Sequence, residues 1–114
     1  MVEQMTANEY QKLCMRTAPC DDEEVLILQG VMGACGEAGE AIEVVKKHKF
    51  QGHELDRVHL VKELGDILWY IATCAEGLGA TLEEVMEVNI EKLRNRYPDR
   101  FDSERSIHRK EGDI

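Results

Sequence analysis

The stretch GEAGEAIEVVKKHKFQGHELDRVHLVKELGD, residues 36–66, decides the fold of this chain. It carries two pairs of acids, Glu37 with Glu40 and Glu63 with Asp66, and the members of each pair are three positions apart. On a helix, that spacing places both acids on one face, one turn from each other. Four carboxylates that face one another repel, and a divalent cation removes the repulsion. The stretch therefore predicts two facing helices that hold a metal ion.

Apolar residues continue at helical spacing on both sides of this stretch. Capping signals and chain breaks place four helices at about residues 6–17, 22–48, 56–78 and 81–97. The cap of the second helix is predicted at Asp21, which has Glu24 three positions later. No strand pattern competes with these helices.

Glycines fall at every third position in the middle of the second predicted helix. Each glycine costs about 1 kcal/mol relative to alanine inside a helix, so several of them need an offsetting cause. We interpret them as allowing close approach of a neighbouring helix, and a break of the helix near residues 30–33 is the alternative. The glycines are Gly30, Gly33, Gly36 and Gly39.

Together these elements predict an all-α fold, an antiparallel helical bundle of about four helices with short connections. We expect residues 1–98 to form a single helical domain, and residues 99–114, which are polar and lack periodicity, to form a tail. Wide apolar stripes on the two long helices leave surface that a second copy would cover. The bundle is therefore expected to be completed by homo-oligomerisation, in the first instance as a homodimer.

Charge and composition narrow the class of protein. The net charge of −9 argues against a nucleic-acid duplex as partner, because phosphate binding needs a basic surface. Residues 1–88 carry 7 Lys and Arg against 17 Asp and Glu, whereas residues 89–114 carry 7 against 6. The absence of an apolar run of about twenty residues and of a signal pattern predicts no membrane span and a cytoplasmic location. The cysteines are predicted to be reduced core thiols: Cys14, Cys20, Cys35 and Cys74.

Most helical acids face solvent, so a solvated face is the alternative interpretation of the four acids. Helical projection favours a metal site, because Glu37 and Glu63 each lie within about 40° of an apolar residue four positions later. Ligands that are all carboxylates select a hard cation, Mg²⁺ or Mn²⁺, over zinc or copper. Glu40 and Asp66 stand where di-iron bundles have histidine. Attack on a phosphoanhydride is the chemistry that such a cation would assist.

A second set of polar residues follows in the fourth predicted helix. Asn89, Lys92 and Arg96 recur at intervals of three and four, so they share one face and could contact phosphates. The alternative is a solvent-exposed basic face.

Three further residues lie near the second acid pair in the sequence. His59 shares a face with that pair and is interpreted as a structural or surface residue. Trp69, Tyr70 and the first predicted helix are candidates for a base pocket, although no spacing rule chooses among them.

Three motifs carry a resemblance to a known family: GEAGE at residues 36–40, KELGD at 62–66 and NIEKLRNRYP at 89–98. They resemble the motifs of the MazG-like nucleoside triphosphate pyrophosphohydrolases of the all-α NTP pyrophosphatase superfamily. That family is marked by Glu-x-x-Glu, a spacer, and Glu-x-x-Asp. The resemblance covers roughly residues 22–101.

The resemblance implies Mg²⁺-dependent hydrolysis of a (deoxy)nucleoside triphosphate to the monophosphate and pyrophosphate, as nucleotide-pool housekeeping. It implies helical dimers or dimers of dimers. The implied metal ligands and catalytic residues, for Mg²⁺ or Mn²⁺ as a substitute, are Glu37, Glu40, Glu63 and Asp66. The residues implied to contact the substrate phosphates are Asn89, Lys92 and Arg96.

Several alternatives stay open at the level of sequence. The chain could be a dUTP/dCTP-type or phosphoribosyl-ATP pyrophosphohydrolase of the same superfamily, or a non-catalytic acidic helical interaction module.

Many relatives place another glutamate where this chain has Gly36, so the base that activates water is open between metal-bound hydroxide and one of the four ligands. The tail cations either close over bound phosphates or stay disordered: Arg105, His108, Arg109 and Lys110.

Overall fold

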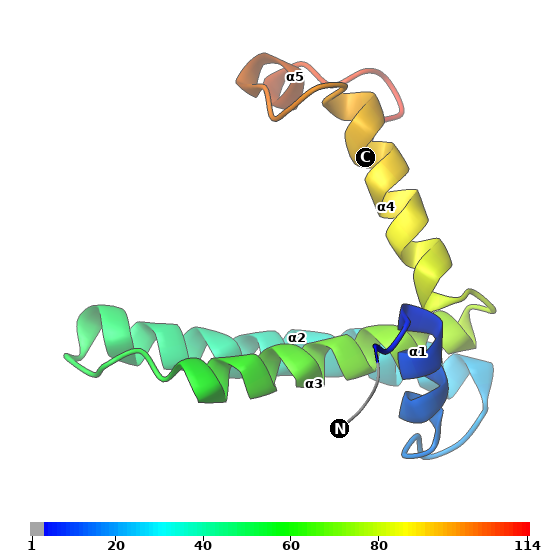
Figure 1. Cartoon of the computed structure of the whole chain (residues 1–114), viewed down its shortest axis with the longest axis vertical. Helices are drawn as coiled ribbons and strands as arrows, with labels where there is room; N and C mark the ends of the chain where they lie inside the picture. Colours follow the sequence, from blue (N-terminus) through cyan, green and yellow to red (C-terminus); the bar gives the residue numbers. More distant parts are fainter. Residues whose placement is uncertain (1–3) are drawn as a thin grey trace. The chain divides into compact units, whose positions relative to one another are not determined.

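A computed structural model describes residues 4–114, and its ordered elements are helices (Figure 1). They are α1 (Ala7–Met15), α2 (Glu23–Phe50), α3 (Arg57–Gly77), α4 (Leu82–Arg96) and α5 (Ser103–Ile107). No strand occurs among residues 4–114, which confirms the predicted all-α class. The chain divides into two compact units, Met1–Leu82 and Glu83–Ile114. Assembly of α1 to α4 into one bundle stays a prediction.

The first three helices begin at side-chain caps. Thr6 accepts a hydrogen bond from the backbone N–H of Glu9, and Asp56 accepts one from the N–H of His59. The cap of α2 is Asp22, which accepts from the N–H of Val25, so the predicted cap at Asp21 is wrong by one residue. Each cap satisfies a backbone donor that has no partner within the helix.

In the first unit, α2 and α3 lie side by side and antiparallel (Figure 1). A Cβ placed on Gly30 would lie 2.5 Å from the Cβ of Cys74 and 2.9 Å from the backbone oxygen of Tyr70. Gly77, near the end of α3, faces the first turn of α2 in the same way, with the backbone oxygen of Glu23 at 2.9 Å from such a Cβ. These glycines let the two backbones approach closely. The α2 helix is continuous from Glu23 to Phe50, so the alternative of a break near residues 30–33 is wrong.

The short helix α1 is attached to α3 by a buried glutamine. The side chain of Gln11 is 4% exposed and donates to the backbone oxygen of Ala80 at 3.0 Å. Its own oxygen accepts from the N–H of Leu82, the first residue of α4, at 2.8 Å. Beside it, Cys14, Ala72 and Leu82 form a small apolar core. The end of α3 and the start of α4 are thus fixed to α1 in the first unit.

Two expectations about the rest of the chain need correction, those for the cysteines and for the polar tail. Cys20 and Cys35 are exposed, so only Cys14 is a fully buried core thiol, and burial raises its pKa. The polar stretch that was expected to lack periodicity includes the helix α5. By length and composition alone, α2 could also cross a membrane, although the core helix of a soluble protein meets the same criterion. The two acids Glu37 and Glu40 interrupt its apolar surface.

Gly30→Ala is expected to destabilise the protein by about 1–3 kcal/mol, because the added methyl group overlaps the backbone of α3. The gain in helix propensity, at most about 1 kcal/mol, does not offset this overlap. Gly39→Ala is the matched control, since a Cβ there meets no atom within 4 Å. Urea unfolding followed by circular dichroism should show a lower midpoint for the first variant and a higher one for the second. Stabilisation by both would contradict the close approach.

Candidate metal centre

Three of the predicted acids meet across α2 and α3. Glu37 of α2 and Glu63 and Asp66 of α3 each offer a carboxylate oxygen, and these oxygens lie within 4.8 Å of one another. The antiparallel packing produces this meeting, because positions further along α2 face positions earlier on α3. The fourth predicted acid, Glu40, is exposed and lies outside this group of three. We refer to Glu37, Glu63 and Asp66 as the acidic cluster.

Glu63 is the most buried member of the acidic cluster, at 8% exposure. Its Oε1 is bonded to Nε2 of His59, one helical turn earlier, at 2.9 Å. Its Oε2 is buried and has no hydrogen-bond partner in the described part of the chain. A buried carboxylate oxygen without a partner is costly, and a cation bound there would remove the cost. His59, interpreted from the sequence as structural, therefore orients a predicted metal ligand.

The neighbouring acids raise the pKa of Glu37 above its ordinary value. The largest cause is the neighbouring Glu63 carboxylate, which can accept a hydrogen bond only from the protonated form of Glu37; burial and the charges of Asp66, Glu63 and Glu40 raise the pKa further. The folded protein thus holds this proton more tightly than the unfolded chain does. The resulting stability is fully present below the ordinary pKa of a glutamate and is lost as the pH rises through the raised value. Above that raised pKa, the ionised carboxylates of the metal-free cluster repel one another.

Tyr10 brings α1 to the edge of the acidic cluster. Its hydroxyl donates to the backbone oxygen of Gly65, next to Asp66, at 3.5 Å. Its pKa is raised, first by burial, then by a hydrogen bond and the charge of Cys14, and last by the charge of Asp66. The hydroxyl therefore stays protonated and can act only as a neutral donor near the cluster. Sequence analysis missed this contact, because nothing in the spacing of α1 relates it to Asp66.

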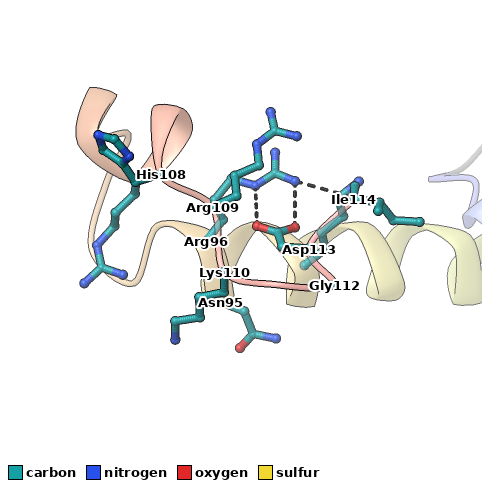
Figure 2. Close-up of a pocket in the computed structure, with 10 residues that line it drawn as sticks. Asn95, Arg96, His108, Arg109, Lys110, Gly112, Asp113 and Ile114 are labelled. Carbon is teal, nitrogen blue, oxygen red and sulfur yellow. Dashed lines mark hydrogen bonds and ion pairs between the residues drawn. The ribbon is translucent and has the colours of Figure 1, made fainter.

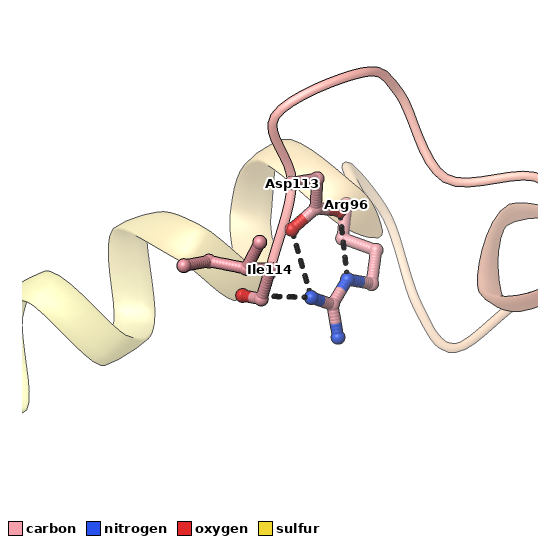
Figure 3. A network of polar contacts seen from close by, with 3 residues as sticks. All are labelled: Arg96, Asp113 and Ile114. Atoms are coloured by element: carbon pink, nitrogen blue, oxygen red, sulfur yellow. Dashed lines mark hydrogen bonds and ion pairs between the residues drawn. The ribbon is translucent and has the colours of Figure 1, made fainter.

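The predicted phosphate-binding residues lie in the second unit, on α4. Asn89 and Lys92 are exposed, whereas the side chain of Arg96 is only 9% exposed. Arg96 makes two hydrogen bonds to the carboxylate of Asp113 (Figure 3). The structure thus keeps the three residues on one helix. Their meeting with the acidic cluster in one site stays a prediction.

The two aromatic candidates for a base pocket differ in their contacts. Trp69 packs against the small core, and its indole N–H donates to the hydroxyl of Thr17 at 3.0 Å. Tyr70 lines a shallow apolar groove with Met32 and Gly33 of α2. Trp69 thus attaches the end of α1 to α3, which leaves Tyr70 as the more available ring.

The acidic cluster fits a hard divalent cation. Its ligands are all carboxylates, they come from two packed helices, and one of their oxygens is buried without a partner. Oxygen ligands of this kind suit Mg²⁺ or Mn²⁺, and fewer than six protein ligands leave positions for water or phosphate oxygens. The arrangement can therefore bind a phosphate-bearing substrate through a shared cation.

Comparison with known proteins gives two matches and one negative result. A family model described as the MazG nucleotide pyrophosphohydrolase domain matches residues 29–101. The "Gene 37 protein" of Mycobacterium phage L5 is 38% identical over 81 residues, covering 68% of this chain and 70% of that protein. No solved structure matches the chain. The family match contains all seven residues predicted for the site.

Binding of Mg²⁺ or Mn²⁺ to the metal-free protein is expected to release up to about one proton at weakly acidic pH and to weaken as the pH falls through the raised pKa of Glu37. The reason is that only the carboxylate form binds the cation. Calorimetry in two buffers of different ionisation enthalpy measures the proton release. Glu37→Gln should lose most of it, whereas Glu43→Gln, which alters an exposed acid on the same helix, should keep it. Equal release by the two variants would refute the role of Glu37.

Proposed function

Because this chain belongs to the MazG nucleotide pyrophosphohydrolase family, we propose that it hydrolyses (deoxy)nucleoside triphosphates to the monophosphate and pyrophosphate, with Mg²⁺ as cofactor. The observation that carries the proposal is the acidic cluster, three carboxylates within 4.8 Å across α2 and α3. Mn²⁺ would substitute for Mg²⁺, because both are hard cations that accept oxygen ligands. The proposed role is housekeeping of the nucleotide pool in the cytoplasm.

In this proposal the acidic cluster holds the cation, and Glu40 joins it as a fourth ligand from the next turn of α2. Bound there, Mg²⁺ would neutralise phosphate charge and lower the pKa of a coordinated water. His59 keeps Glu63 in position through their 2.9 Å hydrogen bond. Tyr10 limits the movement of the Gly65 backbone beside Asp66.

The α–β phosphoanhydride bond breaks as a water oxygen bonds to phosphorus, and the leaving pyrophosphate takes the bonding electrons. Gly36 offers no side chain to accept the proton of that water, so we assign the proton to one of the four carboxylates. The substrate phosphates are contacted by Asn89, Lys92 and Arg96. The positive side chains of Lys92 and Arg96 stabilise the charge that develops on the leaving pyrophosphate. Arg96 can do so only when it is released from Asp113.

Replacing Glu40 or Asp66 with alanine is expected to reduce Mg²⁺-dependent pyrophosphate release by about 100-fold or more, because each variant removes a proposed metal ligand. The helical circular dichroism spectrum should be unchanged. Glu43→Ala, on the exposed face of α2, is the matched control and should retain activity. The assay uses a panel of ribo- and deoxyribonucleoside triphosphates with Mg²⁺, Mn²⁺ or EDTA.

Full turnover by both ligand variants would refute the proposed site. Inactivity of the wild-type protein on every nucleotide would favour the non-catalytic interaction module. A strict preference for one base would identify a specialised member of the superfamily.

Homodimer formation is the second part of the proposal. On α2, large apolar side chains are exposed, including Leu28 at 54% and Met32 at 72%, and they border the groove that Tyr70 lines. A contiguous apolar surface of this kind usually marks an interface, and closed two-fold symmetry is the commonest assembly. A second copy that covers α2 would bury this surface.

Met32→Glu is therefore expected to shift the protein toward the monomer, because it places a charge in the proposed interface. Light scattering coupled to size-exclusion chromatography measures the mass. Lys47→Glu, which adds a glutamate at an exposed polar position of the same helix, should leave the mass unchanged. A wild-type monomer at high concentration would argue against the dimer.

A further inference from the structure

The second unit, Glu83–Ile114, contains a strongly basic pocket of its own (Figure 2). Its volume is about 350 Å³, within the usual range of small-ligand pockets. Its walls are the last turns of α4, the helix α5 and the segment that follows α5. The cations that line it are Lys92, Arg96, Arg105, Arg109 and Lys110, together with His108.

One acid, Asp113, neutralises part of this charge. Its carboxylate accepts hydrogen bonds from Nε of Arg96 at 2.9 Å and from Nη2 at 2.8 Å, a two-point pairing between planar groups (Figure 3). Nη2 also donates to the backbone oxygen of Ile114 at 3.4 Å. Arg96, with its side chain 9% exposed, is thereby fixed in the wall of the pocket.

The surroundings of Asp113 favour negative charge at this place. Its pKa is lowered, first by the hydrogen bonds from Arg96, and the charges of Arg96, Arg109 and Lys92 also lower it. Among the residues that line the pocket, a single side-chain carboxylate faces five Lys and Arg side chains. Most of the positive charge is therefore left without an anion from the pocket lining. A ligand with several negative charges would neutralise more of the positive charge of the pocket than Asp113 does.

We propose that this pocket binds a small phosphate-class anion, a diphosphate or the phosphate chain of a nucleotide, and that Asp113 occupies its place on Arg96 until the anion arrives. Guanidinium groups bind phosphate oxygens in the same two-point geometry in which Arg96 binds this carboxylate. The anion would displace Asp113 and contact Arg109 and Lys110 as well. The segment after α5 would then form part of the anion site, and its residue Asp113 would compete with the anion for Arg96.

The proposal deepens the proposed function and rests on it in part, because Lys92 and Arg96 are also its phosphate-contacting residues. It adds to them Arg105, Arg109, Lys110 and Asp113, which lie after residue 101, where the family match ends. It also does not require the acidic cluster. A chain that binds a diphosphate in EDTA but hydrolyses no nucleotide would support this inference while refuting the proposed function. The two can therefore fail separately.

The test is titration of inorganic pyrophosphate into the full chain in EDTA, followed by calorimetry. Asp113→Asn is expected to bind about tenfold more tightly than the wild type, because a charge-assisted competitor is removed. Glu111→Gln removes the same charge from an exposed neighbouring position and should stay within about twofold of the wild type. Equal affinities of these two variants would overturn the role of Asp113.

A second pair of variants tests the pocket itself, in case Asp113→Asn loosens the tail. The double variant Arg109→Ala with Lys110→Ala should bind pyrophosphate about tenfold more weakly than Lys47→Ala with Lys49→Ala. The latter removes the same two charges from the exposed surface of α2. Equal binding by the two double variants, or no binding by the wild type and Asp113→Asn, would overturn the proposal.

Citrate in place of pyrophosphate should bind more weakly, and equal binding would refute the phosphate class.

A nucleoside triphosphate in EDTA is titrated in parallel to identify the source of the phosphate. Tighter binding than pyrophosphate supports a nucleotide ligand, and weaker binding supports a free diphosphate.

Discussion

The close approach of α2 and α3 is the constraint on which the first unit depends. Gly30 and Gly77 remove the side chains that would hold the two backbones apart. The register that results places Glu37 opposite Glu63 and Asp66, although 25 positions separate the first two in the chain. The glycines determine which faces of the two helices meet, and the relative slide of the helices determines which residues lie opposite one another. Packing at the glycines fixes that slide.

The helices and the meeting of three of the predicted acids followed from sequence, because both depend on the helical periodicity of the apolar and acidic residues. Spacing of three on α2 and α3 correctly brought Glu37 together with Glu63 and Asp66, and the predicted starts of the first and third helices, at about residues 6 and 56, coincide with the observed caps Thr6 and Asp56. Glu40 was assigned by spacing and family pattern alone, and its place as a ligand stays a prediction. The contact of Tyr10 could not be predicted, since it depends on how α1 packs on α3. The contact of His59 lies within α3, four positions before Glu63, and the sequence alone did not distinguish it from that of a structural or surface histidine. Cys35 was assigned to the core from its helical neighbours, but an apolar stripe on α2 is wider than the surface that α3 covers.

Charge is arranged differently in the two units. The first gathers like charges where burial and repulsion make a cation favourable, and it leaves one oxygen of Glu63 without a partner. The second gathers five Lys and Arg side chains around one acidic side chain, that of Asp113, which is held against Arg96. In both places the isolated chain carries an electrostatic cost that a ligand would relieve, a cation in one unit and an anion in the other. Such preorganised charge makes each site selective for the sign of its ligand, because a ligand of the same sign as the site would increase the electrostatic repulsion.

The position of α1 along the hairpin of α2 and α3 has a dynamic consequence. Tyr10 and Gln11 of α1 donate to backbone oxygens of α3 at Gly65 and Ala72, and Trp69 of α3 donates to Thr17, just after α1. These contacts lie toward one end of the hairpin, while the turn that joins α2 to α3 lies at the other end (Figure 1). Within the described unit, residues 41–62 therefore rely on the pairing of the two helices alone. Local opening would begin at the turn and proceed to the acidic cluster, where a bound cation joins α2 to α3. Amide hydrogen exchange in the turn half of the hairpin thus becomes a reporter of cation occupancy that needs no nucleotide.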